Sequence, residues 1–384
     1  MDKTLNRLYI KEIETKAIPF SNEVDTRIFS RILDADRVVA SYKMYWLLGV
    51  LNEVSLGNEE IEFRKIISRM IVSAWYPILK FKLHFGAFDN LSKCVEYISI
   101  NYQIDANCDE NKLLDFIYEN KDKELNKKLK EFENNVPYRL LSPFFQDELR
   151  GKKDSIKEKI ITEMSLKSSN CLYKIIKGDT NKIFVNCKWC QYLKYNYNII
   201  KSWIYYKLVC FLQKRNPNVP AIVFKLEAPK TRKLTSTSKL WKEILNYNRV
   251  KDIYTGFEFT KENFIRYGAL SIDHFIPWSF VLHDEIWNLV PTFKNINSKK
   301  SDNLVLFDKY IGDFCAAQYN AYTYVCDKRK KNQMEEYMNI LHLDSPKLYY
   351  NRVPQHDFEQ KIKLSISPLY QIAVNQGFGI MNKF

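Results

Sequence analysis

The chain has 384 residues, a length that allows two domains or one large domain with an appendage. Hydrophobic residues make up 46% of it, and 25 Tyr with 24 Phe can build a sizeable core, whereas only 10 Gly and 12 Pro argue against a many-stranded β protein. The net charge of +14 favours a polyanionic partner such as nucleic acid or an acidic membrane, although charge alone is equally compatible with a soluble protein that has no such partner.

The chain starts with MDKTLNRLYIKEIETK, which is charged throughout and lacks the apolar core of a signal peptide. No apolar run approaches the roughly 18 residues that are needed to cross a bilayer. The eight cysteines are scattered along the chain, and without a secretory signal they indicate reduced thiols. We therefore expect a cytoplasmic protein with no membrane partner.

Apolar residues recur every three or four positions through most of the first 216 residues, which is typical of helices. A weak hairpin signal interrupts them at residues 172–176 and 183–185. The predicted helices cover residues 25–56, 59–79, 89–102, 109–135, 147–169 and 187–213. Residues 1–216 are thus expected to form a mainly helical domain that serves recognition, regulation or assembly.

Cys187 and Cys190 have the C-x-x-C spacing of a redox pair or of half a zinc site. No second C-x-x-C and no H-x-x-x-H motif accompanies them, and a complete zinc site needs four ligands. We favour two packing thiols at the start of a helix, with a metal site as the alternative.

Residues 217–255 differ in composition, since they combine prolines, a short apolar run and many basic residues. We interpret them as a basic linker between two domains and expect Lys230, Arg232 and Lys233 to contact phosphates. A linker that is merely solvated is the alternative interpretation. The basic residues continue along the segment at Lys239, Lys242, Arg249 and Lys251.

The densest set of chemically active side chains lies in LSIDHFIPWSFVLHDEIWNLVPTFKNINSKKSDN, residues 270–303. Its pattern predicts a strand at 269–273, a second strand at 287–291 and a helix from about residue 294. Two further helices are expected at 304–326 and 332–341, whereas residues 346–384 form a C-terminal extension without a clear period.

The residue types in this stretch suit phosphodiester hydrolysis, which requires an activated water and neutralisation of charge on the phosphate. A divalent cation bound by Asp273 could stabilise that charge and the leaving oxygen. The imidazole of His274 could deprotonate the attacking water, because a histidine titrates near neutral pH. Asn297 could add a second oxygen ligand, and an Asp/Asn oxygen pair favours magnesium or manganese over zinc.

The same stretch resembles the HNH (ββα-metal) endonucleases, and most closely the HNH domain of the CRISPR RNA-guided effector nucleases. The shared frame is DH-x-x-P-x-S-F from Asp273, then Asp284, Asn288, Asn297 and KSDN at 300–303. The chain is not one of those effectors, because neither their second nuclease centre nor their arginine-rich bridge accompanies the motif. The resemblance covers about a tenth of the chain, but its many residue types make it specific.

The resemblance implies a role for each residue of the frame. His274 would be the general base, and Asp273 and Asn297 would hold one Mg²⁺, with Mn²⁺ as an alternative. Asn288 would brace the loop that orients His274, and Lys300 would stabilise charge near the phosphate.

Two further implications concern the surroundings of these residues. Asp284 would cap or brace the loop between the strands. Lys299 and Lys300 would contribute to nucleic-acid binding.

The expected fold is mainly α with a small ββα-metal unit, in which residues 256–345 form the HNH nuclease domain. The expected function is metal-dependent hydrolysis of DNA, and a family-level analogy suggests bacterial defence against foreign DNA. The alternatives are a non-catalytic nucleic-acid-binding or assembly subunit, and an HNH enzyme that cuts RNA. A single HNH centre cuts one strand, so double-strand cleavage would need a homodimer or a protein partner such as an ATPase.

Overall fold

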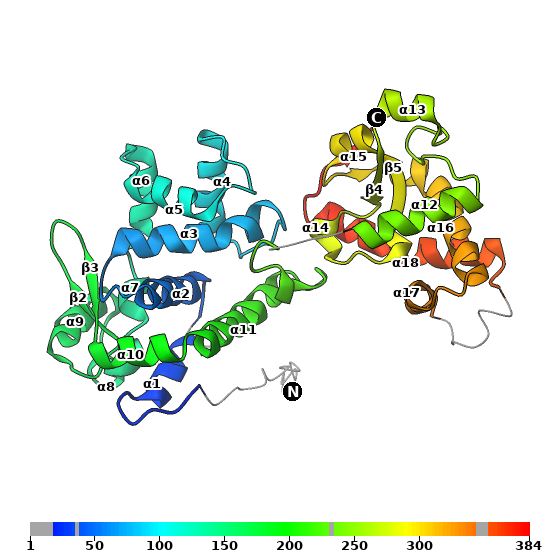
Figure 1. The fold of residues 1–384 in the computed structure, drawn as a ribbon. Helices are drawn as coiled ribbons and strands as arrows, with labels where there is room; N and C mark the ends of the chain where they lie inside the picture. The colour runs from blue at the N-terminus through cyan, green and yellow to red at the C-terminus, as the bar shows by residue number, and fades with distance from the viewer. Residues whose placement is uncertain (1–17, 35–37, 230–233, 343–351) are drawn as a thin grey trace, which may run out of the picture. The chain divides into compact units, whose positions relative to one another are not determined.

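The structure is a computed structural model, in which residues 18–34, 38–229, 234–342 and 352–384 are described. The chain forms two compact units (Figure 1). The first comprises Met1–Pro217 with Lys225–Ala228, and the second comprises Asn218–Phe224 with Pro229–Phe384. Both units consist mostly of helices, which confirms a mainly α fold. Among the described helices, none combines the length and the hydrophobicity that crossing a bilayer requires.

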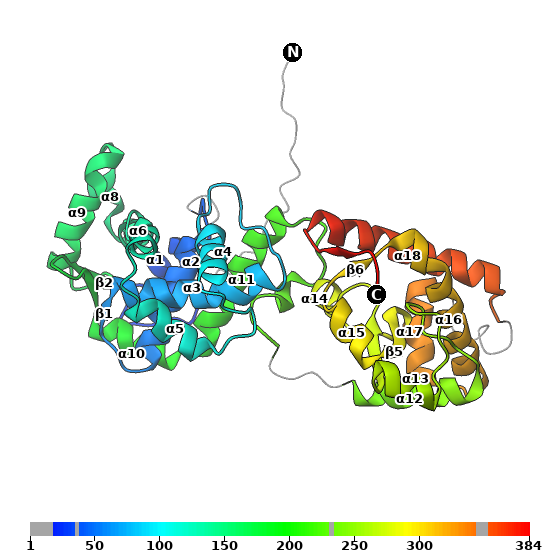
Figure 2. The ribbon, with the colours of Figure 1, turned by 90° about the horizontal axis from the view of Figure 1, so that it is seen from above.

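The first unit is built around α2 (Tyr42–Ser55), which is apolar on almost every side. Tyr45, Trp46 and Leu47 follow one another in it and all three are buried, as expected for a helix at the centre of a domain. Helices α3, α10 and α11 pack around α2 (Figure 2). A Cβ on Gly49 would lie 2.9 Å from Cγ2 of Ile66, so the close approach of α2 and α3 requires a glycine there.

The elements of the first unit are α1 (Thr26–Ser30), the 3-10 helix η1 (Arg31–Leu33), α2, β1 (Glu60–Glu62), α3 (Phe63–Leu79), α4 (Leu91–Asn101), α5 (Glu110–Glu119), α6 (Lys123–Glu131), α7 (Val136–Arg139), η3 (Ser142–Phe145), α8 (Gln146–Leu149), α9 (Asp154–Lys167), β2 (Tyr173–Ile176), β3 (Lys182–Val185), α10 (Cys187–Tyr195) and α11 (Tyr197–Arg215). The predicted hairpin is confirmed as β2 and β3, and β1 pairs antiparallel with the other edge of β3.

The helix predicted over residues 109–135 is interrupted, because one side chain from α3 and one at the break itself satisfy the backbone there. Arg64 of α3 donates to the carbonyl oxygens of Tyr118 and Ile117 at 2.5 and 2.8 Å, which ends α5. The carboxylate of Asp122 accepts from the backbone N–H of Leu125 at 2.8 Å and begins α6. The helix predicted over 187–213 is likewise divided, at Asn196.

Of the C-x-x-C pair, Cys187 is exposed and Cys190 is buried at the start of α10. Burial raises the pKa of the Cys190 thiol to about 11, so this thiol stays protonated at neutral pH.

The elements of the second unit are η4 (Ile222–Phe224), α12 (Thr235–Tyr247), α13 (Lys261–Tyr267), β4 (Leu270–His274), α14 (Trp278–Val281), η5 (Ile286–Asn288), β5 (Leu289–Phe293), α15 (Lys294–Lys300), β6 (Leu304–Val305), α16 (Phe307–Asp327), α17 (Lys331–Leu341), α18 (Gln355–Asn375) and β7 (Ile380–Met381). Strands β4 and β5 pair antiparallel with Asp273 opposite Val290, and α15 follows β5 directly. This order, two strands and then a helix, is the ββα arrangement that the sequence predicts.

Helix α16 packs against β5 of the ββα unit and against α17 and α18 (Figures 1 and 2). The rings of Phe275, just after β4, and Phe314 of α16 stack with centroids 4.2 Å apart. The buried amide of Gln318 donates to the carbonyl oxygens of Ile286 and Leu289, at 3.1 and 2.8 Å. These contacts hold the connection between the two strands in one position.

Two segments that the sequence analysis placed outside the nuclease domain belong to this core. In the segment expected to be a linker, α12 buries Leu240, Trp241 and Ile244 in it. In the segment expected to be a C-terminal extension, α18 buries Phe358 and Ile362 in the same core. Both helices are amphipathic, so each removes an apolar face from water by packing against the unit.

Replacing Trp241 with Ala should therefore destabilise the second unit by about 3–5 kcal/mol, because the substitution leaves a large cavity in its core. Hydrogen exchange read by mass spectrometry on the full chain should show faster exchange in α12 and α16, with α2 and α3 unchanged. Ser236→Ala, an exposed change on the same helix, is the control. Equal protection of α16 in both variants would mean that α12 does not contribute to this core.

Candidate active site

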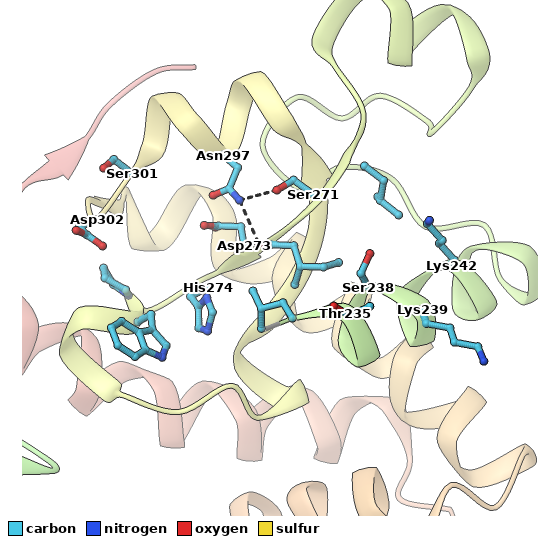
Figure 3. Close-up of a pocket in the computed structure, with 15 residues that line it drawn as sticks. Thr235, Ser238, Lys239, Lys242, Ser271, Asp273, His274, Asn297, Ser301 and Asp302 are labelled. Carbon is cyan, nitrogen blue, oxygen red and sulfur yellow. Dashed lines mark hydrogen bonds between the residues drawn. The ribbon is translucent and has the colours of Figure 1, made fainter. Parts of the chain in front are cut away.

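A pocket of about 760 Å³ opens beside the carboxyl end of β4 (Figure 3). Three of the predicted site residues line it, namely Asp273, His274 and Asn297. The first two come from β4, and the third comes from α15. The opposite wall is formed by α12, which presents Ser238 and Lys242 to the same pocket.

Asp273 is only 4% exposed, and two side chains bond its carboxylate. The hydroxyl of Tyr254 donates to Oδ2. The ammonium of Lys300 lies 3.2 Å from Oδ1 and 3.1 Å from Oδ2. An ionised carboxylate has about four acceptor positions, so one remains for a further partner on the pocket side.

Lys300 was expected to contact phosphate, but the structure places its side chain in the interior, fully buried. Its ammonium also donates to the carbonyl oxygen of His274 at 2.7 Å. The last turn of α15 points the side chain inward, so the charge lies between α15 and β4. A buried ammonium must be paired in this way, because an unpaired charge in the interior is very costly.

The Nε2 atom of His274 lies 2.8 Å from Oδ1 of Asp284. With Asp284 ionised, the carboxylate accepts from Nε2–H, and the lone pair of the neutral ring is then on Nδ1. Asp284 thus selects the tautomer and the orientation of the imidazole, a contact that the resemblance described only as a cap or brace.

The neighbouring His283 is placed differently. It packs its ring on Trp287, with centroids 4.8 Å apart. Burial lowers the pKa of this histidine, which favours the neutral ring.

Asn288 is fully buried, and its side chain bonds both the backbone N–H and the backbone carbonyl of Ile276. Its Oδ1 accepts from the N–H of Ile276, and its Nδ2 donates to the carbonyl oxygen of the same residue, both at 2.9 Å. Its own carbonyl oxygen accepts from the N–H of Phe275 at 2.9 Å. Asn288 therefore ties the chain immediately after His274 to the start of β5.

Asn297 uses its amide nitrogen within the fold. Nδ2 donates to Oγ of Ser271 at 2.8 Å and to the carbonyl oxygen of Ile272 at 3.0 Å. These two bonds orient the amide, and its oxygen lies on the same side as the carboxylate of Asp273 (Figure 3). The arrangement offers two oxygen atoms from different elements to the same pocket.

The residues predicted to contact nucleic acid differ in their exposure to solvent. Lys299 is exposed on α15, whereas Lys300 is buried. Lys230, Arg232 and Lys233 lie outside the described residues.

Tyr254 is the site residue that the sequence analysis missed. It lies 19 positions before Asp273 and outside the frame that resembles the HNH endonucleases, so no local pattern connects the two. Its ring packs against Tyr310 and Phe384, at centroid distances of 5.7 and 4.6 Å, which directs the hydroxyl toward Asp273. Only the fold brings this donor to the carboxylate.

The comparisons with known proteins agree with this geometry in one segment. Residues 252–306 match the HNH endonuclease family. This HNH segment, residues 252–306, contains Tyr254 and every residue of the frame discussed above, from Asp273 to Lys300. Lys230, Arg232, Lys233, the helices α12 and α16, and Phe384 lie outside it. No curated protein and no solved structure matches the chain. The HNH segment therefore supports a nuclease in general terms.

The buried pair of the HNH segment gives a stability prediction. Replacing Lys300 with Met should destabilise the second unit by about 3–5 kcal/mol, because Asp273 would keep a buried charge without its partner. The double variant with Asp273→Asn should recover much of that loss, since neither charge remains. Urea unfolding monitored by hydrogen exchange in β4 and α15 measures both effects. If the double variant is as unstable as the sum of the single variants, the two side chains are not coupled.

Proposed function

We propose that the HNH segment hydrolyses phosphodiester bonds of DNA, with His274 as general base and one divalent cation held by Asp273 and Asn297. The observation that supports it is the shared pocket, where these three side chains converge within the segment that matches the HNH family. The positive charge of the chain is compatible with such a substrate.

The proton-transfer step follows from the His274–Asp284 contact. With Nε2–H donated to Asp284, Nδ1 is the basic nitrogen, and it takes a proton from the water that attacks phosphorus. Asp284 then stabilises the imidazolium that forms, as a carboxylate beside a catalytic histidine does in other hydrolases. The brace formed by Asn288 limits movement of the chain that carries His274.

The residues fit a hard cation with few protein ligands. Within the described part of the chain, no group of three or more His, Cys, Asp or Glu side chains is arranged as a metal cage. One carboxylate and one amide oxygen suit Mg²⁺ or Mn²⁺, which keep several waters and bind substrate phosphate, more than they suit zinc. When bound, the cation would neutralise charge on the scissile phosphate and support the leaving oxygen.

Lys300 and Tyr254 act on the carboxylate and not on the substrate in this proposal. Their bonds to Asp273 restrict the rotation of its carboxylate, so one oxygen stays directed to the pocket. A ligand held in this way loses less entropy when it binds a cation. Lys300 is thus proposed as a positioning residue for Asp273, in place of the contact with phosphate that the resemblance implies.

Replacing His274 with Ala should lower DNA cleavage by about 10²- to 10⁴-fold, the usual contribution of a general base. Nicking of supercoiled plasmid in Mg²⁺ is the measurement, with labelled RNA in a parallel reaction. His356→Ala, an exposed histidine on α18, is the matched control and should cut like the unchanged chain.

Unchanged nicking by the His274 variant would remove His274 as the base. Cleavage of RNA alone would favour the RNA-cleaving alternative. If no condition yields cleavage while nucleic acid still binds, the non-catalytic binding subunit is favoured. A role in defence against foreign DNA stays a prediction from the family-level analogy.

Chelation should abolish cleavage, because the proposed mechanism relies on the cation to neutralise charge on the scissile phosphate. Adding Mg²⁺ or Mn²⁺ back after EDTA should restore the rate, whereas Zn²⁺ alone should not. The variant Asp273→Asn should need a higher Mg²⁺ concentration for half-maximal rate, since it removes the charged ligand. Cleavage that persists in excess EDTA would contradict the cation's role.

A further inference from the structure

A second hollow of about 720 Å³ adjoins the active-site pocket. The two hollows share Lys242 of α12 and Leu270 of β4. We call the pair the α12 groove, whose helical wall consists of Thr235, Ser238, Lys242, Asn246 and Arg249. These residues follow each other at spacings of three or four, so they lie on one face of α12 and just beyond its end.

The helical wall is positively charged, and the charges are available. Among the residues that the structure describes, none forms an ion pair or hydrogen bond with the side chains of Lys242 or Arg249. Glu243 is the single acidic residue of α12, and it lies on another face. Its carboxylate accepts from Tyr324 and Lys330, each at 2.9 Å, so it does not offset the charge in the groove.

The opposite wall differs in chemistry. Phe259 and Phe264 line it together with Leu270, and both rings are partly exposed. Glu258, the acidic residue of this wall, disfavours phosphate there. A polyanion in the groove would therefore place its phosphates against α12 and its bases and sugars against the apolar wall, as in grooves that bind single strands.

The groove leads directly to the proposed reaction centre. Figure 3 shows Thr235, Ser238, Lys239 and Lys242 along α12, beside the strand that carries Asp273 and His274. Helix α12 has 13 residues and is thus roughly 20 Å long, enough for several nucleotides at about 3.4 Å per step. Thr235 and Ser238, near the start of α12, line the pocket with His274, whereas Arg249, just beyond its end, lines the second hollow.

We infer that the α12 groove binds a single-stranded stretch of DNA next to the scissile phosphate, with Lys242 and Arg249 on successive backbone phosphates. The inference rests on the proposed nuclease function for the nature of the ligand. It assigns to α12 a substrate role that the family match does not cover, since the match begins at residue 252.

The test measures binding apart from cleavage. In the His274→Ala background, a fluorescent single-stranded oligodeoxynucleotide is titrated with the full chain at several salt concentrations. The double variant Lys242→Ala/Arg249→Ala should bind about 10- to 30-fold more weakly near 0.1 M salt. Its slope of log affinity against log salt should be smaller by about 1.4, since each phosphate contact with a single strand contributes about 0.7.

The control is a double variant that removes two positive charges from another surface of the second unit. Lys331→Ala/Lys363→Ala changes two exposed lysines, on α17 and α18, and should leave the slope unchanged. Lys242→Arg with Arg249→Lys keeps both charges and should retain most of the affinity. All of these side chains are exposed, so thermal unfolding should not distinguish the variants.

Four results would overturn the inference: an equal slope change in the control pair, no change in the groove variant, an effect on duplex DNA alone, or no binding of single strands by the parent chain. Failure of the proposed nuclease function has a different signature. If the chain never cuts, but its binding of single strands depends on Lys242 and Arg249, the groove inference stands and the nuclease proposal fails. If cleavage depends on His274, but the Lys242→Ala/Arg249→Ala variant binds normally, the nuclease proposal stands and the groove inference fails.

Discussion

The buried ion pair between Asp273 and Lys300 is the constraint on which the rest of the second unit depends. A fully buried ammonium is tolerated only when its hydrogen bonds are made, and here they go to the Asp273 carboxylate and to the carbonyl oxygen of His274. These bonds fix the distance between α15 and β4. The pocket wall that carries Asn297 is positioned by the same contact, because Asn297 lies one turn before Lys300 on α15.

The rigidity of this wall extends into the supporting helices. Gln318 of α16 bonds the backbone on both sides of Asn288, and Asn288 in turn bonds the backbone after β4. Polar bonds of this kind are specific in direction, whereas the surrounding apolar contacts are not. The side chains of the candidate site are therefore held by a connected set of buried hydrogen bonds, as preorganised catalysis requires.

The local pattern predicted much of the architecture. The ββα order, the hairpin of the first unit and many of the helices follow from periodicity, because each is a property of neighbouring residues. Helices α12 and α18 did not follow, since they lie in segments that were expected to be a linker and an extension. The breaks within the long predicted helices did not follow. The division between α5 and α6 depends on Arg64, about fifty residues earlier in the chain, which satisfies the carbonyl groups at the end of α5.

For the candidate site, the sequence by itself determined the identities and spacing of Asp273, His274, Asn288 and Asn297, since they lie within one short contiguous motif. The tertiary structure decided the surroundings of these residues. It turned Lys300 inward, directed the hydroxyl of Tyr254 to Asp273, and placed α12 beside β4. Such contacts arise when distant segments bury apolar faces against one core, and that packing has no local signal in the chain.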